Sequence, residues 1–263
     1  MVIIDNYVRA QSLEEAYELN SAKNSRIIGG MLWIKLSNNK IKTAIDLSDL
    51  GLNRIEEDDE QFSIGSMVTL RDIELNESLN AYTNNSIRNS VKDIVGVQFR
   101  NMATVGGSIW GRFGFSDVLT VFLALDSYVE LYKGGIIPLS EFVNMKRDKD
   151  ILVRIIVKKT PLKVSYSSVR NQRTDFPVLT CATSVIDGVY KVAIGARPKK
   201  AMLVTDSDNI LASGVNETNI SAFAEYVANN IPTSSNLRGS SEYRTHLIKV
   251  LTERNIKNME GIS

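Results

Sequence analysis

The chain has very few of the side chains that build metal centres. Among its 263 residues are one cysteine, Cys181, and one histidine, His246. A single cysteine excludes an internal disulfide and any iron–sulfur cluster held by four thiolates of this chain. A single histidine excludes a zinc or iron centre with several histidine ligands. Any redox chemistry of this protein is therefore expected to come from a bound cofactor.

The chain also lacks long apolar runs and an excess of charge of either sign. No run is long enough to cross a bilayer, and the first residues have neither the basic nor the apolar region of a signal peptide. The 31 Lys and Arg residues nearly balance the 30 Asp and Glu residues, which leaves a formal net charge of +1. We expect a cytoplasmic protein with neither nucleic acid nor a membrane as partner.

Neither the lone cysteine nor the lone histidine is expected to have a catalytic or ligand-binding role. Cys181 lies in Pro-Val-Leu-Thr-Cys-Ala-Thr, which is typical of a buried strand, so its thiol is predicted to be an inert part of the core. His246 lies in a polar helical segment and is predicted to be at the surface.

Hydrophobic periodicity and capping signals predict a mixed, α+β chain of three segments. The segments are 1–55, a small α/β unit; 56–150, an α+β unit; and 151–263, a small antiparallel sheet with packed helices. Strands are expected over 26–28, 43–47, 62–65, 128–132, 153–157, 164–169, 180–185 and 189–194. Helices are expected over 12–20, 69–75, 86–95, 117–125, 199–212, 217–230 and 241–255. The acidic run 56–60 is expected to be a solvated hairpin turn, and Asp187-Gly188 a second hairpin.

Two glycine pairs are the strongest candidates for a binding site. Gly29-Gly30 follows the apolar Ile27-Ile28, and Gly106-Gly107 follows Thr104-Val105. Because glycine has no Cβ, backbone N–H groups there can approach a ligand closely, and successive amides of this kind bind anions such as a pyrophosphate. Thr104 and Ser108 add hydroxyl donors, and Asp117 can accept from a ribose or polyol hydroxyl. We expect two loops that clamp one phosphate-bearing cofactor, and a valine at Gly106 or Gly107 is expected to block it without disturbing the fold.

The residues around these glycines resemble the FAD-binding domain of the molybdenum hydroxylase family. That family has an Arg-Asn-x-Ala-Thr-Ile-Gly-Gly-Asn-Ile run, then an Asp that opens an apolar helix and a Val-Glu-Leu strand. The matching stretches here are 100–109, Asp117 and 129–131. Further similar stretches cover nearly the whole chain: 28–33, 44–47, 64–70 and 237–244.

The resemblance implies a fold, a cofactor and partners. The fold is a two-part FAD-binding domain of the vanillyl-alcohol oxidase type followed by a C-terminal domain. FAD is the implied cofactor, and a molybdopterin-binding large subunit and a [2Fe-2S] small subunit are the implied partners. Electrons would pass from the iron–sulfur clusters through FAD to NAD or another acceptor. The implied cofactor-binding residues are Ile27, Ile28, Gly29, Gly30, Met31, Leu32, Trp33, Ile94, Thr104, Val105, Gly106, Gly107, Ser108, Asp117 and Arg170, with Arg173 as an alternative to Arg170.

This sequence departs from the family pattern at two places. Met31 and Leu32 stand where the family has hydroxyl and polar residues, and 111–116 reads Gly-Arg-Phe-Gly-Phe-Ser in place of a stretch with Ala-Ser-Pro. Arg112 is a candidate partner for a phosphate or for another subunit. These departures leave a second function open, a flavin- or nucleotide-binding assembly protein without electron transfer of its own.

Overall fold

The computed structural model describes residues 1–262, and they form two compact units. The first unit contains residues 1–72, 97–111 and 127–158. The second unit contains residues 73–96, 112–126 and 159–262.

A three-stranded parallel sheet forms one part of the first unit. Its order is β1 (Ile3–Arg9), β3 (Lys40–Asp46) and β2 (Ser25–Ile28). Helix α1 (Leu13–Ser21) begins as expected, because Ser12 Oγ accepts from the Glu15 amide at 3.1 Å. The Glu15 carboxylate in turn accepts from the amide of Gln11, the residue before the cap. Strand β1 was not predicted, since its Ile-Ile-Asp-Asn-Tyr-Val-Arg sequence does not alternate.

A five-stranded antiparallel sheet forms the other part of the first unit. Its order is β4 (Ile55–Glu57), β5 (Gln61–Gly65), β8 (Leu152–Lys158), β6 (Ser127–Leu131) and β7 (Gly135–Pro138). The expected acidic hairpin is confirmed between β4 and β5. Strand β8 pairs with β5 and β6, so the expected boundary at residue 150 falls just before a strand of this sheet. The three-segment division stays a prediction.

Short helices connect the strands. They are η1 (Ile34–Leu36), η2 (Ser48–Leu50), α2 (Leu70–Leu75), α5 (Val97–Arg100), α6 (Val105–Gly111) and α8 (Leu139–Phe142). Thr69 caps α2 as expected, since its Oγ1 accepts from the Asp72 amide at 3.1 Å.

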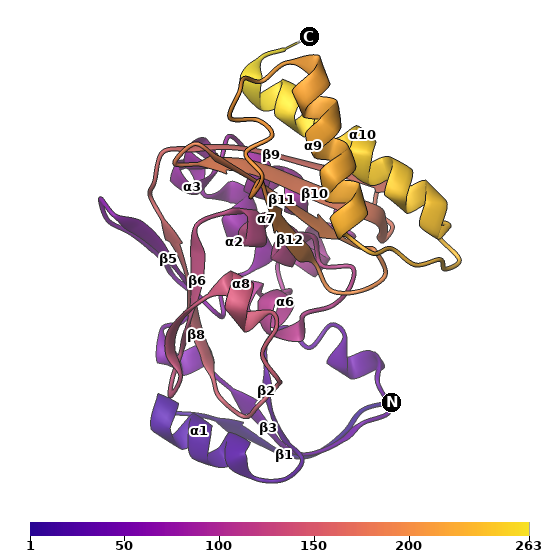
Figure 1. Ribbon diagram of the computed structural model, residues 1–263. Helices are drawn as coiled ribbons and strands as arrows, with labels where there is room; N and C mark the ends of the chain where they lie inside the picture. The colour runs from indigo at the N-terminus through magenta and orange to yellow at the C-terminus, as the bar shows by residue number, and fades with distance from the viewer. Residues whose placement is uncertain (263) are drawn as a thin grey trace. The chain divides into compact units, whose positions relative to one another are not determined.

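The second unit is built on a four-stranded antiparallel sheet. Its order is β12 (Met202–Thr205), β11 (Val189–Gly195), β10 (Pro177–Ile186) and β9 (Leu162–Arg170). Helices α9 (Glu217–Asn230) and α10 (Ser241–Glu260) pack together, and α10 lies along β9 and β10 (Figure 1). Helix α7 (Asp117–Ala124) packs against β10 and β11, and all eight of its residues are buried. Two further helices are α3 (Glu77–Tyr82) and α4 (Ser86–Val91).

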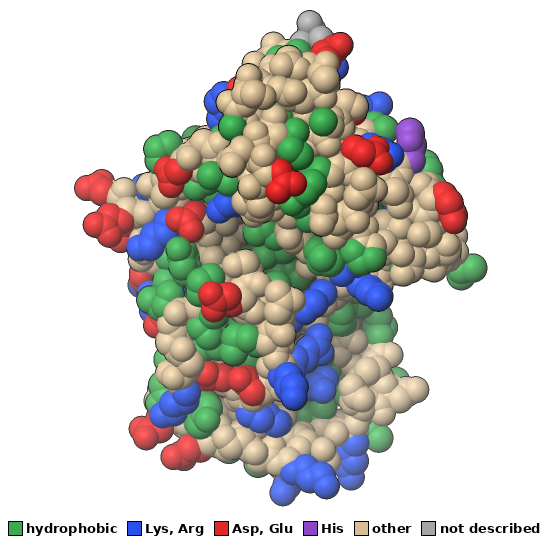
Figure 2. All heavy atoms as spheres, in the orientation of Figure 1, with side chains coloured by type: hydrophobic (Ala, Val, Ile, Leu, Met, Phe, Trp, Pro, Cys, Tyr) green, Lys and Arg blue, Asp and Glu red, His purple; other side chains and the backbone are tan. Residues whose placement is uncertain are grey.

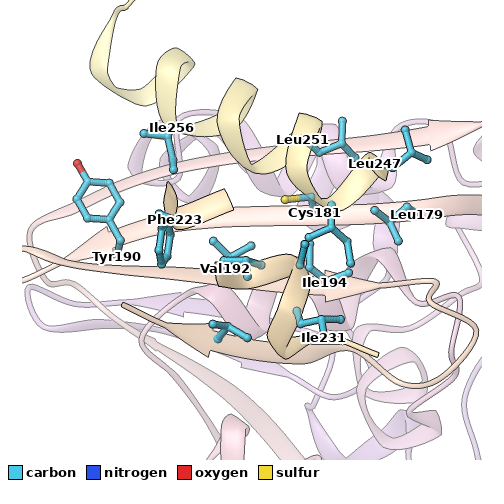
Figure 3. Packing of buried hydrophobic residues seen from close by; sticks show 14 of the residues in the cluster. Leu179, Cys181, Tyr190, Val192, Ile194, Phe223, Ile231, Leu247, Leu251 and Ile256 are labelled. Atoms are coloured by element: carbon cyan, nitrogen blue, oxygen red, sulfur yellow. The ribbon is translucent and has the colours of Figure 1, made fainter. Parts of the chain in front are cut away.

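Side chains of the sheet and of α9 and α10 form the core of the second unit (Figure 3). Cys181 lies in it, and burial raises the pKa of its thiol to about 11, so the thiol stays protonated at neutral pH. His246 is exposed on α10, at the surface in Figure 2. Both expectations for these two residues are confirmed.

The sequence misplaced three helical segments of the second unit. The helix expected over 199–212 is wrong, because residues 202–205 pair with β11 as strand β12. The helix expected over 86–95 ends at Val91, and α10 runs five residues beyond its expected end at Asn255. For β12 the pairing with β11, a tertiary contact, decided and not local propensity.

The described residues include no helix that is long and apolar enough to span a membrane. Within residues 1–262 there is also no group of three or more His, Cys, Asp or Glu side chains arranged to hold a metal ion.

Candidate functional site

The first glycine pair lies at the carboxyl end of strand β2. The buried Ile28 ends the strand, and residues 29–33 turn into η1 with all five residues half-buried. Met31 has a φ of 57°, a left-handed conformation that is uncommon for a residue with a Cβ. Ile27 lies half-buried on the strand itself.

The second glycine pair starts a helix and is not an open loop. The Val105 and Gly106 amides donate to the carbonyls of Val68 and Ser66 at 2.9 and 3.0 Å. The Gly107 amide donates to Thr104 Oγ1, and the Ser108 amide to the Thr104 carbonyl, both at 3.1 Å. Ser108 Oγ also donates to that carbonyl. The expectation of free amides at this pair is therefore wrong, because Thr104 and the 66–68 segment already accept from them.

The two glycine segments lie directly against each other. A Cβ added to Gly29 would stand 2.7 Å from Thr104 Oγ1, and one added to Gly30 would stand 1.8 Å from the Met102 carbonyl oxygen. The rings of Trp33 and Phe99 pack with centroids 6.0 Å apart. The structure thus brings together residues that are about 75 positions apart in the sequence, as expected.

Open hydrogen-bond donors remain at this contact. Among residues 1–262, the amides of Gly30, Met31 and Leu32 have no hydrogen-bond partner. Thr104 Oγ1 accepts from Gly107, and its own proton remains available as a donor. Successive amides without partners are the kind of donors that bind anions such as a pyrophosphate. These donors are backbone amides. They are therefore present even though Met31 and Leu32 stand where the family has polar side chains.

Asp117 is the first residue of α7 in the second unit, where Ser116 caps the helix. Asp117 Oδ1 accepts from Tyr166 Oη and from Arg170 Nη2, each at 2.5 Å. Burial raises the pKa of the Asp117 carboxyl to about 6, although the charge of Arg170 and the bond from Tyr166 both act to lower it. The same burial and the Asp117 charge hold the pKa of Tyr166 well above its ordinary value.

Arg170 and Arg173 have different surroundings. The Arg170 side chain is 8% exposed, and its Nη1 donates to the Asp175 carbonyl at 2.5 Å. Its Nε is buried and has no hydrogen-bond partner in the part of the chain that the structure describes. Arg173 is exposed and pairs with Asp93. Of the two alternatives, Arg170 is the one that meets Asp117.

Three further features of the second unit complete the candidate residues. Ile94 is half-buried just after α4, and its amide donates to the Val91 carbonyl at 2.9 Å. Phe113 stacks on Phe115 with ring centroids 5.2 Å apart, and Phe115 meets Phe176 edge to face.

Sequence reasoning missed several residues that shape the site. The carbonyls of Ser66 and Val68 accept from the second glycine segment and the Met102 carbonyl lies against Gly30, and a backbone carbonyl carries no signal in a sequence. Tyr166 was counted only as part of a strand, and nothing local links it to Asp117, 49 positions away.

Comparison with known proteins identifies the family. Residues 3–160 match the model of the FAD binding domain in molybdopterin dehydrogenase, and residues 164–259 match the CO dehydrogenase flavoprotein C-terminal domain. The chain is 26% identical to the glyceraldehyde dehydrogenase medium chain of Sulfolobus acidocaldarius, over 97% of this chain and 98% of that protein. It is 23% identical to the xanthine dehydrogenase FAD-binding subunit of Escherichia coli O157:H7, over 95% and 94% of the two chains.

A solved structure has the same fold. Carbon monoxide dehydrogenase from Hydrogenophaga pseudoflava superposes with a TM-score of 0.87 at 18% identity, over 98% of this chain and 97% of that chain. The expected α+β architecture, an FAD-binding domain followed by a domain with an antiparallel sheet, is confirmed. The chain belongs to the family of FAD-binding subunits of the molybdenum hydroxylases, which are oxidoreductases that act in complexes.

Proposed function

We propose that this chain is the electron-transfer subunit of a molybdenum hydroxylase complex. It would receive electrons from the [2Fe-2S] clusters of a small subunit, which a molybdopterin-binding large subunit reduces, and pass them through FAD to NAD or another acceptor. The observation that carries the proposal is the row of open amides at Gly30, Met31 and Leu32, which follow Gly29 where it lies against Thr104. The relatives named as medium chain and FAD-binding subunit support it.

The chain's own part is to bind and orient the cofactor. Bound FAD would supply the exchange between one-electron carriers and a two-electron acceptor. The three open amides would each donate a charge-assisted hydrogen bond to the pyrophosphate, worth roughly 1.5–3 kcal/mol apiece. The interlocked glycine segments fix these donors before the ligand arrives, so little ordering cost is left to binding.

In the second unit, Ile94, Asp117 and Arg170 stay candidates for contact with the flavin. Asp117 Oδ1 is already occupied by Tyr166 and Arg170, so a ligand hydroxyl would have to use Oδ2. The pairing with Arg170 keeps the carboxylate in one orientation.

The direct test is a titration of the full-length chain with FAD. Trp33 lies in the first glycine segment and Trp110 in α6, so tryptophan emission and the flavin absorbance bands report the same site. We expect saturable quenching at about one FAD per chain. Absence of quenching in a folded chain would contradict the proposal.

Electron transfer needs a second measurement. Under anaerobic conditions, NADH or a partner complex supplied with its substrate should bleach the absorbance of the bound flavin. If FAD binds but neither donor reduces it, the assembly-protein alternative replaces electron transfer.

A further inference from the structure

Strand β1 is an uncovered edge of the three-stranded sheet in the first unit. It lies at the N-terminal end of the chain (Figure 1), and its only neighbouring strand among residues 1–262 is β3. Six of its seven residues are exposed, and the seventh is half-buried. The exposed residues include large apolar side chains: Ile3 at 58%, Ile4 at 36% and Tyr7 at 57%. An edge of this kind is a template on which another strand can pair.

The backbone of β1 has hydrogen-bonding groups that β3 does not use. The Ile3 amide donates to the Asn39 carbonyl at 3.1 Å, so the backbone groups of Ile3 and of every second residue of the strand face β3. Those of Ile4, Asn6 and Val8 point away from β3, and the part of the chain that the structure describes has no strand on that side. A strand laid along this edge would therefore meet a row of donors and acceptors.

The other edges of the described sheets are short, charged, ended by proline or covered. Strands β2 and β12 have four residues each. Strand β4 has three residues, two of them glutamates, and β7 ends in Pro138. Strand β9 packs against α4 and α10. These are the usual ways in which proteins block an edge. Strand β1 has seven residues, no proline and one charge of each sign, so it lacks this protection.

The sequence of β1 complements itself in an antiparallel pair centred on Asn6. In that register all seven residues overlap, and Ile4 stands opposite Val8 of the other copy. Arg9 of one copy is then a diagonal neighbour of Asp5 of the other copy, at a separation that a long side chain can reach. The outward-facing backbone groups of one copy also meet those of the other.

Neighbouring registers fit less well. A pair centred on Asp5 would set two carboxylates directly opposite each other, and like charges in that position are destabilising. A pair centred on Tyr7 would leave Ile3 and Ile4 beyond the end of the opposite strand. The pattern of charges and apolar residues therefore favours the register centred on Asn6.

The ion pairs that Asp5 and Arg9 make within the chain do not prevent this pairing. Arg9 contacts Asp49, and Asp5 Oδ2 lies 3.6 Å from Lys40 Nζ. All four side chains are exposed, and ion pairs of this kind contribute at most about 1 kcal/mol each. Both residues can therefore turn toward a second copy at little cost.

We propose that two copies of this chain associate through β1, antiparallel and centred on Asn6, so that their three-stranded sheets join into one sheet across a two-fold axis. The proposal depends on the first unit alone. It does not rest on FAD binding or on electron transfer.

Sedimentation velocity of the full-length chain at about 100 μM tests the association. The parent should sediment with twice the mass of one chain. Asn6→Pro removes an outward-facing amide from each copy, so the dissociation constant of the dimer should rise at least about tenfold. Asn6→Ala is the matched control, because it loses the same bond from Asn6 Nδ2 to the Lys42 carbonyl but keeps the amide. It should dimerise as the parent does, and thermal unfolding should show both variants folded.

Single cysteine substitutions report the register independently. In Asn6→Cys the two thiols stand opposite each other, with a Cα separation of about 5.5 Å that a disulfide can span. In Asp5→Cys and Tyr7→Cys the two thiols are diagonal neighbours about 7–8 Å apart, which is too far. Mild oxidation should cross-link Asn6→Cys at least about tenfold faster than the other two. The natural Cys181 is buried and does not compete.

Three results would overturn the inference. They are a parent that sediments as a monomer, an Asn6→Pro variant that dimerises as tightly as the parent, and fastest cross-linking in Asp5→Cys or Tyr7→Cys. A monomeric parent would leave the edge to a strand of another protein. Since FAD takes no part in these measurements, failure of this inference is distinguishable from failure of the proposed function.

Discussion

Some positions in this chain require glycine because other backbone atoms lie where a Cβ would stand, and not only because a ligand must come close. A Cβ at Gly106 would stand 2.4 Å from the Ser66 carbonyl oxygen, which is backbone and cannot move aside cheaply. A Cβ at Gly107 meets only Thr104 Oγ1, at 2.9 Å. The expectation that valine at either position spares the fold therefore holds only for Gly107, and the two positions become a matched pair.

We expect Gly106→Val to unfold or strongly destabilise the chain, by about 3 kcal/mol or more, because the first unit must open at Ser66. Gly107→Val should keep most of its stability and lose FAD affinity, since its side chain intrudes on Thr104 beside the open amides. Thermal unfolding followed by the FAD titration measures both. Equal stability of the two variants would show that Ser66 does not constrain this helix.

A second prediction concerns the buried pair of Asp117 and Arg170, whose contribution to stability depends on pH. Arg170→Met leaves the Asp117 carboxylate buried without its cation, so the free energy of unfolding at pH 8 should fall by about 3–5 kcal/mol. Urea unfolding at pH 8 and at pH 5 measures this. The loss should be smaller at pH 5, where Asp117 is protonated and needs no counter-charge.

The direction of this pH dependence follows from the raised pKa of the Asp117 carboxyl. The folded carboxyl has a pKa of about 6 against an ordinary 3.8, so the folded state holds the proton more tightly than the unfolded state. The stability that this group contributes is complete below pH 3.8 and is lost as the pH rises through 6. Asp117→Asn in the Arg170→Met background removes the charge, so it should restore stability at pH 8 and remove the contribution of this carboxyl to the pH dependence.

At the level of elements, Arg244 joins three parts of the second unit. It lies on α10 and is 1% exposed. Its guanidinium donates to the carbonyls of Val178 on β10, Ser234 and Gly239, and to Asn236 Oδ1. The stretch 237–244, which resembles a family motif, therefore has a structural role: Arg244 at the start of α10 bonds to the loop that precedes the helix.

Because four acceptors depend on this one side chain, Arg244→Met should lower the free energy of unfolding by roughly 3 kcal/mol or more. Arg244→Lys should recover little, since an ammonium cannot reach acceptors spread around a planar fork. Arg254→Met, on the exposed side of the same helix, is the control and should change stability by less than about 0.5 kcal/mol. Chemical denaturation of the three variants measures these changes in the free energy of unfolding.

Elements with strong local signals were predictable, and those fixed by distant partners were not. The Asp187-Gly188 turn formed where expected, with φ angles of 50° and 78°, because few residue pairs tolerate two left-handed positions. Helix α9 was predicted to the residue, and in the structure the Asn216 side chain caps its first turn. Strand β12 and the Asp117–Tyr166 bond depend on residues far away in the sequence, and the occupied amides of 105–108 depend on carbonyls of residues 66–68.

At the scale of the whole molecule, near-neutral charge makes cofactor binding visible by electrophoresis. The chain carries a formal net charge of +1, and the pyrophosphate of FAD carries roughly two negative charges. One bound FAD should therefore reverse the net charge to about −1 and turn the direction of migration in a native gel near pH 7. Gly107→Val, incubated with the same FAD, should migrate as the cofactor-free parent does. Reversal by the variant as well would mean that Gly107 does not lie at the site that holds the dinucleotide.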